Sequence, residues 1–262
     1  MLGAIAGDII GSRFEFNNYR DTDFELFTDQ CEFTDDTICT AAVADALINN
    51  KPFDESLQYW CRKYPNPKGG YGGRFARWIQ SDNPQPYFSY GNGSAMRVSP
   101  CAWFSEELYL VLEDAERSAV CTHNHPFGIT GAKAVAECIF QAKKGAFQEK
   151  IKKIIEDKYG YDLSQDIDTI RKNNTFDETC QVTVPQAIIA FLESNDFEHA
   201  IRLAVSIGGD SDTIAAITGS IAEAYYLVPS HIKDKAMEYL PDEIQELIKT
   251  FYHKIDRAIY LE

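Results

Sequence analysis

The sequence predicts an all-α fold made of one compact domain. Apolar side chains recur at spacings of three and four along most of the 262 residues, which is the pattern of helices that bury one face. Alternating runs of Val, Ile and Thr, which are typical of strands, are nearly absent. We find no repeat of fixed period and no low-complexity tract, so residues 1–262 are expected to form a single domain.

The elements follow in chain order. Residues 3–16, "GAIAGDIIGSRFEF", are expected to begin with a helix whose three glycines, spaced four residues apart, let another helix approach closely. The glycine- and proline-rich residues 64–73 predict a loop, and the polar residues 158–180 predict an excursion from the core. Further helices are expected at residues 35–48, 55–64, 95–104, 128–145, 182–194, 197–209, 212–228 and 241–262.

The composition excludes several classes of function. The chain carries 25 Lys and Arg against 40 Asp and Glu, a net charge of -15, so nucleic acid is not an expected partner. The apolar runs are too short for a membrane span, and the opening segment lacks the basic leader of a signal peptide. The seven cysteines are scattered and form no C-x-x-C pair, which argues against a disulfide framework and fits a cytoplasmic protein.

Carboxylates gather at the start of the helix expected over 212–228. In "GGDSDT", two glycines end the preceding helix, and Asp210, Ser211, Asp212 and Thr213 open the next one. Each of them is a good N-cap or first-turn residue, so helix capping alone explains any single one. Their spacing also lets both carboxylates and the Thr213 hydroxyl converge on one point.

A second expected helix start has the same composition. "FTDDT" places Thr34, Asp35 and Asp36 directly before an apolar stripe, and two adjacent carboxylates are more than one cap needs. If the two starts meet in the fold, they offer four carboxylates and two hydroxyls, which are hard oxygen ligands for Mg²⁺ or Mn²⁺ rather than for zinc. Four negative charges would balance two divalent ions. Helix capping and a dinuclear metal site therefore stand as alternatives.

Glu15 stands between Phe14 and Phe16 at the end of the first expected helix. A carboxylate flanked by aromatic rings loses hydration, and this raises its pKa toward the range that a general acid needs at neutral pH. The alternative is an ordinary surface glutamate. Residue types alone leave both interpretations open.

Five segments, in this order, resemble the ADP-ribosylglycohydrolase family, which includes the dinitrogenase reductase activating glycohydrolases. They are "GAIAGDIIGSRFEF", "FTDDT", "SYGNGSAMRVSP", "THNHP" and "GGDSDTIAAITGS", and they lie between residues 3 and 220. The resemblance implies an all-α fold with two Mg²⁺ ions in a cleft. It also implies an enzyme that removes ADP-ribose from its partner, an ADP-ribosylated protein or a small ADP-ribose conjugate.

The resemblance further implies roles for single residues. Glu15, Asp36 or Asp212 would handle the proton while water attacks C1 of the distal ribose. The metal ligands that it implies are Thr34, Asp35, Asp36, Asp210, Asp212 and Thr213. The substrate-binding residues that it implies, near the pyrophosphate and the distal ribose, are Ser89, Tyr90, Gly91, Asn92 and His123.

Several other features have more than one interpretation. A glycine-rich turn such as "YGNGS" ahead of a helix suits a phosphate, and is otherwise an ordinary turn. The "HNHP" segment has the spacing of a metal pair, but no further soft ligand stands at a useful distance along the chain. Tyr71, Trp78 and Tyr87 are candidates for stacking on adenine or for packing, and Arg97 is expected to be structural.

Two positions depart from the family pattern. Glu223 and Leu227 stand where many members have glycine, so the packing at the end of that helix is expected to differ.

Two other functions stand as alternatives: a module that binds ADP-ribose with little turnover, and another two-metal hydrolase such as a phosphatase. Because all ligand candidates and Glu15 are present, we expect a magnesium-dependent glycohydrolase.

Overall fold

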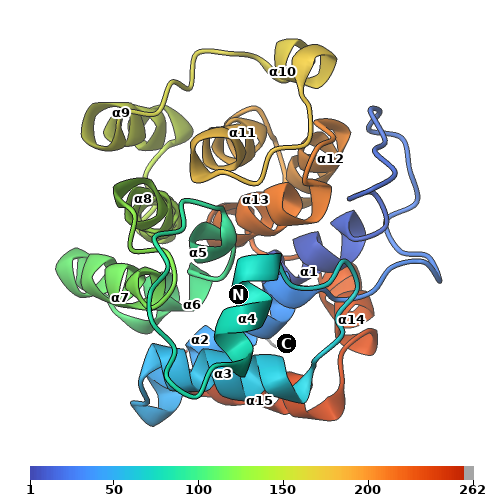
Figure 1. The fold of residues 1–262 in the computed structure, drawn as a ribbon. Coiled ribbons are helices and arrows are strands. Elements are labelled where there is room, and N and C mark those ends of the chain that lie inside the picture. Colours follow the sequence, from blue (N-terminus) through green and yellow to red (C-terminus); the bar gives the residue numbers. More distant parts are fainter. Residues whose placement is uncertain (257–262) are drawn as a thin grey trace.

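The helices of the computed structural model surround one buried helix, α13 (Ser211–Tyr226). The structure describes residues 1–256, and within that range it contains helices and two isolated β-bridges but no strand. Figure 1 shows α13 flanked by α1 (Leu2–Gly11), α11 (Cys180–Leu192) and α12 (Phe197–Ser206), each of which packs against it. The predicted all-α fold is confirmed.

Side-chain periodicity did not predict five helices, one of which, α10, lies inside the expected excursion: α4 (Gly73–Gln80), α7 (Leu108–Val120), α9 (Gln148–Tyr159), α10 (Ile167–Asn173) and α14 (Ser230–Glu238). Several of them bury few side chains, such as Ile151 and Ile155 in α9. The expected helix at 241–262 ends earlier, and its last six residues lie outside the described range. No described helix combines the length and apolarity needed to cross a bilayer.

The remaining helices of the described residues are α2 (Asp35–Asn49), α3 (Phe53–Lys63), α5 (Gly93–Met96), α6 (Ser99–Phe104), α8 (Pro126–Lys143) and α15 (Asp242–Lys254).

The expectation of one helix over 95–104 is wrong, because α5 ends at Met96 and α6 begins at Ser99. Pro100 stands in the first turn of α6. A proline has no N–H to donate to the carbonyl four residues earlier, here that of Met96, and its ring would clash with that carbonyl in a continuous helix. The chain therefore leaves the helical path between α5 and α6.

The glycine ridge of α1 lets this helix lie directly on α13. A Cβ at Gly3 would come within 2.1 Å of the Gly219 carbonyl oxygen, and a Cβ at Gly7 within 2.1 Å of the Ala215 carbonyl oxygen. No side chain fits at such distances, so this backbone contact requires glycine. Because the contacts run in opposite directions along the two helices, the end of α1 reaches the start of α13.

Glu223, where the resemblance implies glycine in many members, is fully buried and accepts several hydrogen bonds. Its carboxylate accepts from the Met1 amine at 2.7 Å, from the Gly3 amide at 2.8 Å and from the Tyr252 hydroxyl. The side chain therefore links α1, α13 and α15. At the second departure, Leu227 has a φ of 68° directly after α13, a backbone conformation that favours glycine.

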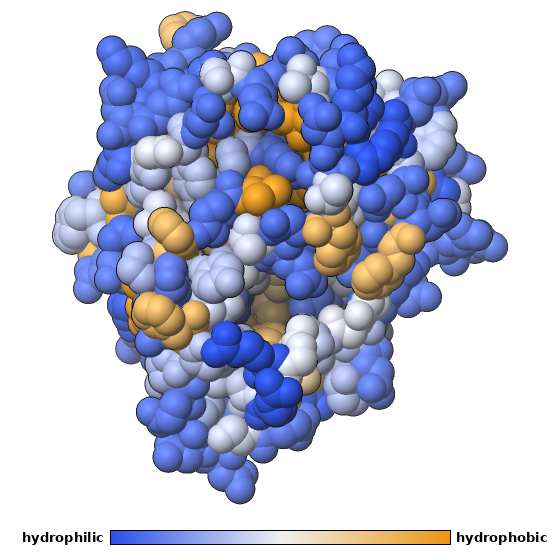
Figure 2. Space-filling model, turned by 45° about the horizontal axis from the view of Figure 1, so that its top comes forward, coloured by the Kyte–Doolittle hydropathy of each residue, from blue (hydrophilic) through white to orange (hydrophobic). Residues whose placement is uncertain are grey.

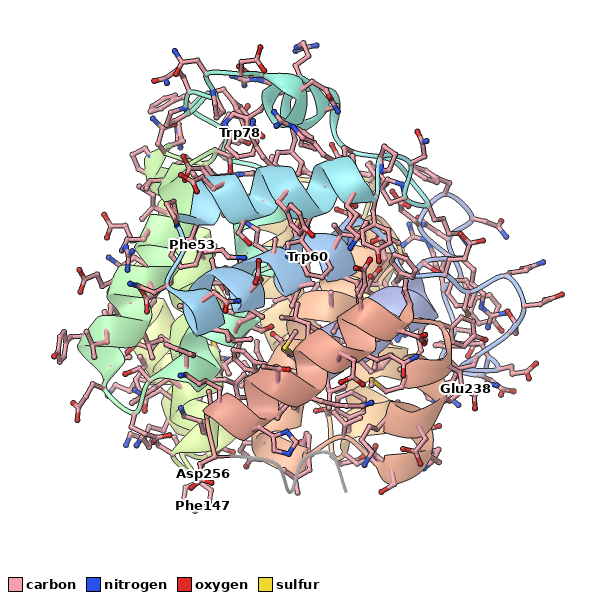
Figure 3. The ribbon with its side chains drawn as sticks, turned by 90° about the horizontal axis from the view of Figure 1, so that it is seen from below. Phe53, Trp60, Trp78, Phe147, Glu238 and Asp256 are labelled. Atoms are coloured by element: carbon pink, nitrogen blue, oxygen red, sulfur yellow. The ribbon has the colours of Figure 1, made fainter. Side chains whose placement is uncertain are left out.

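The underside of the molecule is closed by α2, α3 and α15. Seen from below, Trp60 lies where α3 meets α2, and α15 crosses the same face (Figure 3). The Trp60 indole donates to Asp45 Oδ2 at 3.1 Å, which ties α3 to α2. These contacts hold α2, whose first turn carries the second acidic pair.

Candidate active site

The two acidic helix starts lie side by side. The Thr213 hydroxyl of α13 donates to Asp36 Oδ1 of α2 at 3.3 Å, although the two residues are 177 apart in the chain. Both side chains are buried. The fold therefore brings the two acidic helix starts together, which the sequence alone could not show.

Capping explains only part of these helix starts. Thr34 caps α2, because its Oγ1 accepts from the Asp36 amide at 3.2 Å. Asp210 precedes α13 but makes no capping bond with its side chain, and its Oδ2 instead accepts from Asn92 Nδ2 at 2.6 Å. Asp36 Oδ2 and Asp212 Oδ1 are buried without a hydrogen-bond partner in the described part of the chain. Two buried carboxylate oxygens are thus available to a cation.

Three carboxylates meet closely enough to share one ion. One oxygen each of Glu15, Asp210 and Asp212 lies within 4.8 Å of the others. All these donors are oxygens, the ligand type of hard cations. Over residues 1–256, no comparable group includes His or Cys, so the interpretation of "HNHP" as a zinc pair gains no support.

Burial and mutual repulsion raise the pKa values of these acids. Burial is the larger cause for Asp35, Asp36 and Asp212, and neighbouring carboxylates add to it, so these pKa values lie well above the ordinary range. Burial likewise raises the pKa of Asp210 to about 7 and that of Glu15 to about 8. The cluster cannot hold all its negative charges without a counter-charge, which a divalent cation would supply.

These acids belong to a cleft of about 370 Å³. Figure 2 shows the hollowed face, where apolar side chains are scattered among hydrophilic ones around the opening. Besides the carboxylates, the cleft is lined by Arg74, Arg97 and the glycine-rich turn at 91–93. It therefore offers acidic groups and positively charged donors within one cavity, although the chain as a whole is acidic.

Three of the four expected substrate-binding loop residues line this cleft. They are Ser89, Gly91 and Asn92. The Gly91 amide donates to Ser89 Oγ at 3.2 Å, and the Asn92 amide donates to the Glu178 carbonyl at 2.7 Å. The turn is thus held in place by the segment that precedes α11, and Asn92 joins it to the acidic cluster.

Tyr90 is the member of that loop whose side chain the structure places outside the cleft lining. It is 48% exposed, and its ring lies 5.2 Å from that of His125 between centroids. Phe88 and Phe127 contact the same imidazole, at 4.5 Å and 5.0 Å. These four residues form an exposed aromatic patch beside the turn. Tyr90 stays a predicted substrate-binding residue, and its ring lies beside the residues that line the cleft rather than among them.

His123 lines the cleft as a neutral imidazole. Burial, and then the charges of Arg97 and Arg74, lower its pKa well below the ordinary 6.5. Its Nδ1 shares a hydrogen bond of 2.7 Å with the Thr122 hydroxyl. A Cβ on Gly93 would lie 3.2 Å from Nε2, so the ring rests against the glycine-rich turn.

Of the remaining candidates, some line the cleft and one packs in the hydrophobic core. Arg97 has the expected structural contact, since its Nη2 donates to the Ser118 carbonyl at 2.7 Å, and it also lines the cleft. Tyr71 and Tyr87 line the cleft as well. Trp78 is buried in the hydrophobic core and is not available for stacking on a ligand.

Sequence reasoning missed two polar residues that shape the site. Asn18 Nδ2 donates to the Glu15 carbonyl and to the Gly209 carbonyl, both at 2.9 Å. The Gly209 amide in turn donates to Asn18 Oδ1 at 2.8 Å. Asp8 accepts from the backbone and side chain of Thr34. A carboxylate inside the otherwise apolar first helix was the available signal for Asp8, whereas nothing in the spacing singles out Asn18.

Comparisons with known proteins show the family of the chain. The family model described as ADP-ribosylglycohydrolase matches residues 1–259. ADP-ribosylhydrolase ARH3 from Mus musculus is 24% identical, over 96% of this chain and 86% of that protein. ADP-ribosylarginine hydrolase Tri1 from Serratia proteamaculans is also 24% identical, over 86% of this chain and 70% of that protein.

A solved structure also matches the fold. It is described as an ADP-ribosylglycohydrolase-related protein complex, and it superposes with a TM-score of 0.73 at 25% identity, over 98% of this chain and 97% of that one. The sequence match and the structural match both extend over nearly the whole chain. The chain therefore belongs to the ADP-ribosylglycohydrolase family and is an enzyme that hydrolyses glycosidic bonds.

Proposed function

We propose that this enzyme is magnesium-dependent and cleaves the bond at C1 of the distal ribose, releasing ADP-ribose from modified protein side chains or small conjugates. The observation that carries the proposal is a pair of buried carboxylate oxygens, Asp36 Oδ2 and Asp212 Oδ1, that have no hydrogen-bond partner among residues 1–256. Both acids line the cleft. The names of the relatives, ADP-ribosylhydrolase and ADP-ribosylarginine hydrolase, agree with a substrate of this class.

The acids at the two helix starts fit a pair of Mg²⁺ ions, and Mn²⁺ would fit the same oxygen-only donor set. When bound, the ions would supply the positive charge that grips the 2- and 3-hydroxyls of the distal ribose. They would also supply the counter-charge that the buried carboxylates lack. The proposed ligands are Thr34, Asp35, Asp36, Asp210, Asp212 and Thr213.

The other parts of ADP-ribose match the rest of the cleft. The pyrophosphate would lie at the turn that includes Ser89, Gly91 and Asn92, where Arg74 provides positive charge. The neutral His123 adds no charge there and offers Nε2, which lies against the turn, for a hydrogen bond. The adenine would stack on the exposed aromatic patch around Tyr90, because flat apolar faces beside the turn suit a purine.

We assign Glu15 to proton transfer rather than to metal binding, although one of its oxygens lies within 4.8 Å of oxygens of Asp210 and Asp212. It lines the cleft and is only partly buried, whereas Asp36 and Asp212 are buried at the helix starts. Gly69, at a φ of 77°, leaves room for it, since a Cβ there would come within 2.7 Å of Glu15 Oε2. In the protonated form, Glu15 would donate to the leaving atom as its bond to C1 breaks. The resulting carboxylate would accept a proton from the attacking water.

The test is a mass-spectrometric assay of ADP-ribose release from arginine-linked, serine-linked and small-molecule conjugates, with Mg²⁺ and with a chelator. We expect release of intact ADP-ribose from at least one conjugate, and loss of that release in the chelator. Binding of ADP-ribose without any release would favour a sensing module instead. Release of inorganic phosphate from a generic ester would point to a phosphatase and contradict the proposal.

A further inference from the structure

Asp8 is a buried carboxylate that does not line the cleft. It lies in α1, whose ten residues are all buried and otherwise apolar or glycine. Burying a carboxylate in such a helix is costly unless several donors satisfy it. The reason for keeping it must therefore lie in what it contacts.

The donors to the Asp8 carboxylate, as far as the described residues show them, come from the first turn of α2 and its cap. The Thr34 amide donates to Asp8 Oδ2 at 3.0 Å, and the Thr37 amide donates to the same oxygen at 3.1 Å. The Thr37 hydroxyl donates to Oδ2 as well, and the Thr34 hydroxyl donates to Oδ1 at 2.7 Å. Asp8 thus holds the beginning of the helix that carries Asp35 and Asp36.

The bond to Oδ1 also decides which way the Thr34 hydroxyl points. A hydroxyl has one hydrogen and two lone pairs. The hydrogen of Thr34 is given to Asp8, and one lone pair accepts from the Asp36 amide at 3.2 Å. What remains is a lone pair, so Thr34 has no hydrogen to direct at a cation.

We propose that Asp8 is a positioning residue that prepares Thr34 as a metal ligand by taking the hydrogen of its hydroxyl. The inference rests on the proposed function, in which Thr34 is a ligand. Residues behind the ligands of a metal site commonly orient them in this way, and their loss lowers metal affinity by about 10- to 100-fold. No part of the role requires Asp8 to touch substrate.

The variant Asp8→Asn tests the proposal, because an amide has nearly the same shape. Its carbonyl can face the three donors that now meet Oδ2, and its NH₂ then faces Thr34 Oγ1. The Thr34 hydroxyl must accept there and turn its hydrogen elsewhere. We expect Mn²⁺ affinity, measured by calorimetry on the full chain, to fall by about 10- to 100-fold.

A double-mutant cycle separates this role from general destabilisation. Thr34→Val removes the hydroxyl, so Asp8→Asn should cause no further loss of Mn²⁺ affinity in that background. In the Thr34→Ser background, which keeps the hydroxyl, Asp8→Asn should again lower the Mn²⁺ affinity. Thr37→Val is the matched control, because it removes one bond to Asp8 without turning the Thr34 hydroxyl, and it should bind Mn²⁺ like the wild type.

The outcomes are distinguishable. Wild-type Mn²⁺ affinity in Asp8→Asn, or losses that simply add in the double variant, would overturn the role of Asp8 and leave the proposed function intact. A wild-type protein that binds no Mn²⁺ would overturn both. If Asp8→Asn does not fold, Asp8→Ala provides the same test, because an alanine side chain has no acceptor for the Thr34 hydroxyl. Unchanged affinity in Asp8→Ala would equally contradict the proposal.

Discussion

The Thr213 hydroxyl donates to Asp36 Oδ1 at 3.3 Å and joins the starts of two helices that are 177 residues apart in the chain. The first helix, α1, contacts both of these helices and so fixes the distance between their starts. Its glycines contact the backbone of α13, and its Asp8 accepts from the first turn of α2. The geometry of the acidic cluster therefore depends on a helix outside the cleft.

Asp212→Ala should abolish turnover, with the helix content in circular dichroism unchanged. The substitution removes a buried oxygen that has no hydrogen-bond partner among the described residues, so it breaks no internal bond at that oxygen. The matched control is Asp242→Ala, which removes an exposed acid from the first turn of α15 and should retain activity. Turnover at the wild-type rate in Asp212→Ala would remove this acid from the mechanism.

Mg²⁺ should raise the thermal stability of the protein. The carboxylates of the cluster repel one another, and an ion that binds only the folded state stabilises it by about 2.7 kcal/mol at a concentration of 100 Kd. The measurement is thermal unfolding with a chelator and with increasing Mg²⁺. Asp36→Ala should lose most of the increase. An identical melting temperature with and without Mg²⁺ would contradict binding at this cluster.

Asn18→Asp should lower kcat by about 10- to 100-fold and leave the affinity for ADP-ribose unchanged. The new carboxylate oxygen would face the carbonyls of Glu15 and Gly209, which now accept from the Asn18 amide. Repulsion would shift the backbone that carries Glu15. Steady-state kinetics and calorimetry with ADP-ribose provide the two readouts. The exposed neighbour is tested as Asn17→Asp and should behave like the wild type.

Leu227→Gly should increase the free energy of unfolding by about 1 kcal/mol, because a non-glycine residue in such a conformation costs about 1 to 3 kcal/mol. Leu227 has a φ of 68° and a ψ of 156°, and its side chain is 52% exposed, so little apolar burial is lost. Urea unfolding measures the change. A stability equal to or below that of the wild type would show that the Leu227 side chain compensates for its backbone strain.

Asp45 should make stability depend on pH in the acidic range. Burial alone would raise its pKa, but hydrogen bonds from Lys51, Trp60 and Asn49 outweigh it and lower the pKa below the ordinary 3.8. The bonded carboxylate therefore stabilises the fold fully above pH 3.8, and this stabilisation is lost as the pH falls through the lower folded pKa. The difference in unfolding free energy between wild type and Asp45→Asn should shrink on acidification. If this free-energy difference grows on acidification, the pKa of Asp45 is raised by folding rather than lowered.

Much of the candidate site could be predicted from residue types and order. Asp210, Asp212 and Thr213 stand at a helix start because their side chains suit the first turn, and that preference is local. The structure shows a capping bond at Thr34 but none at Asp210, whose carboxylate accepts from Asn92 instead. Which carboxylates cap and which face the cleft depends on partners far away in the chain.

The sequence by itself determined the helical class, the glycine ridge of α1 and the two acidic helix starts. Each of these follows from the spacing of side chains within a few turns, where the geometry of the helix is known in advance. The prediction of one helix over 95–104 was wrong, although Pro100 lacks the N–H that a continuous helix would donate to the carbonyl of Met96.

The tertiary structure alone decided which of these residues meet. Asp8 reaches a cap 26 residues later, and Asn18 meets Gly209 across 191 residues. Tyr90 leaves the cleft lining because its ring packs on His125. Such contacts depend on how helices pack at their glycine and side-chain surfaces, and the same local pattern is compatible with many packings. Spacing along the chain therefore identifies the candidate ligands, and the packing of α1 against α13 and α2 brings the two helix starts that carry them into contact.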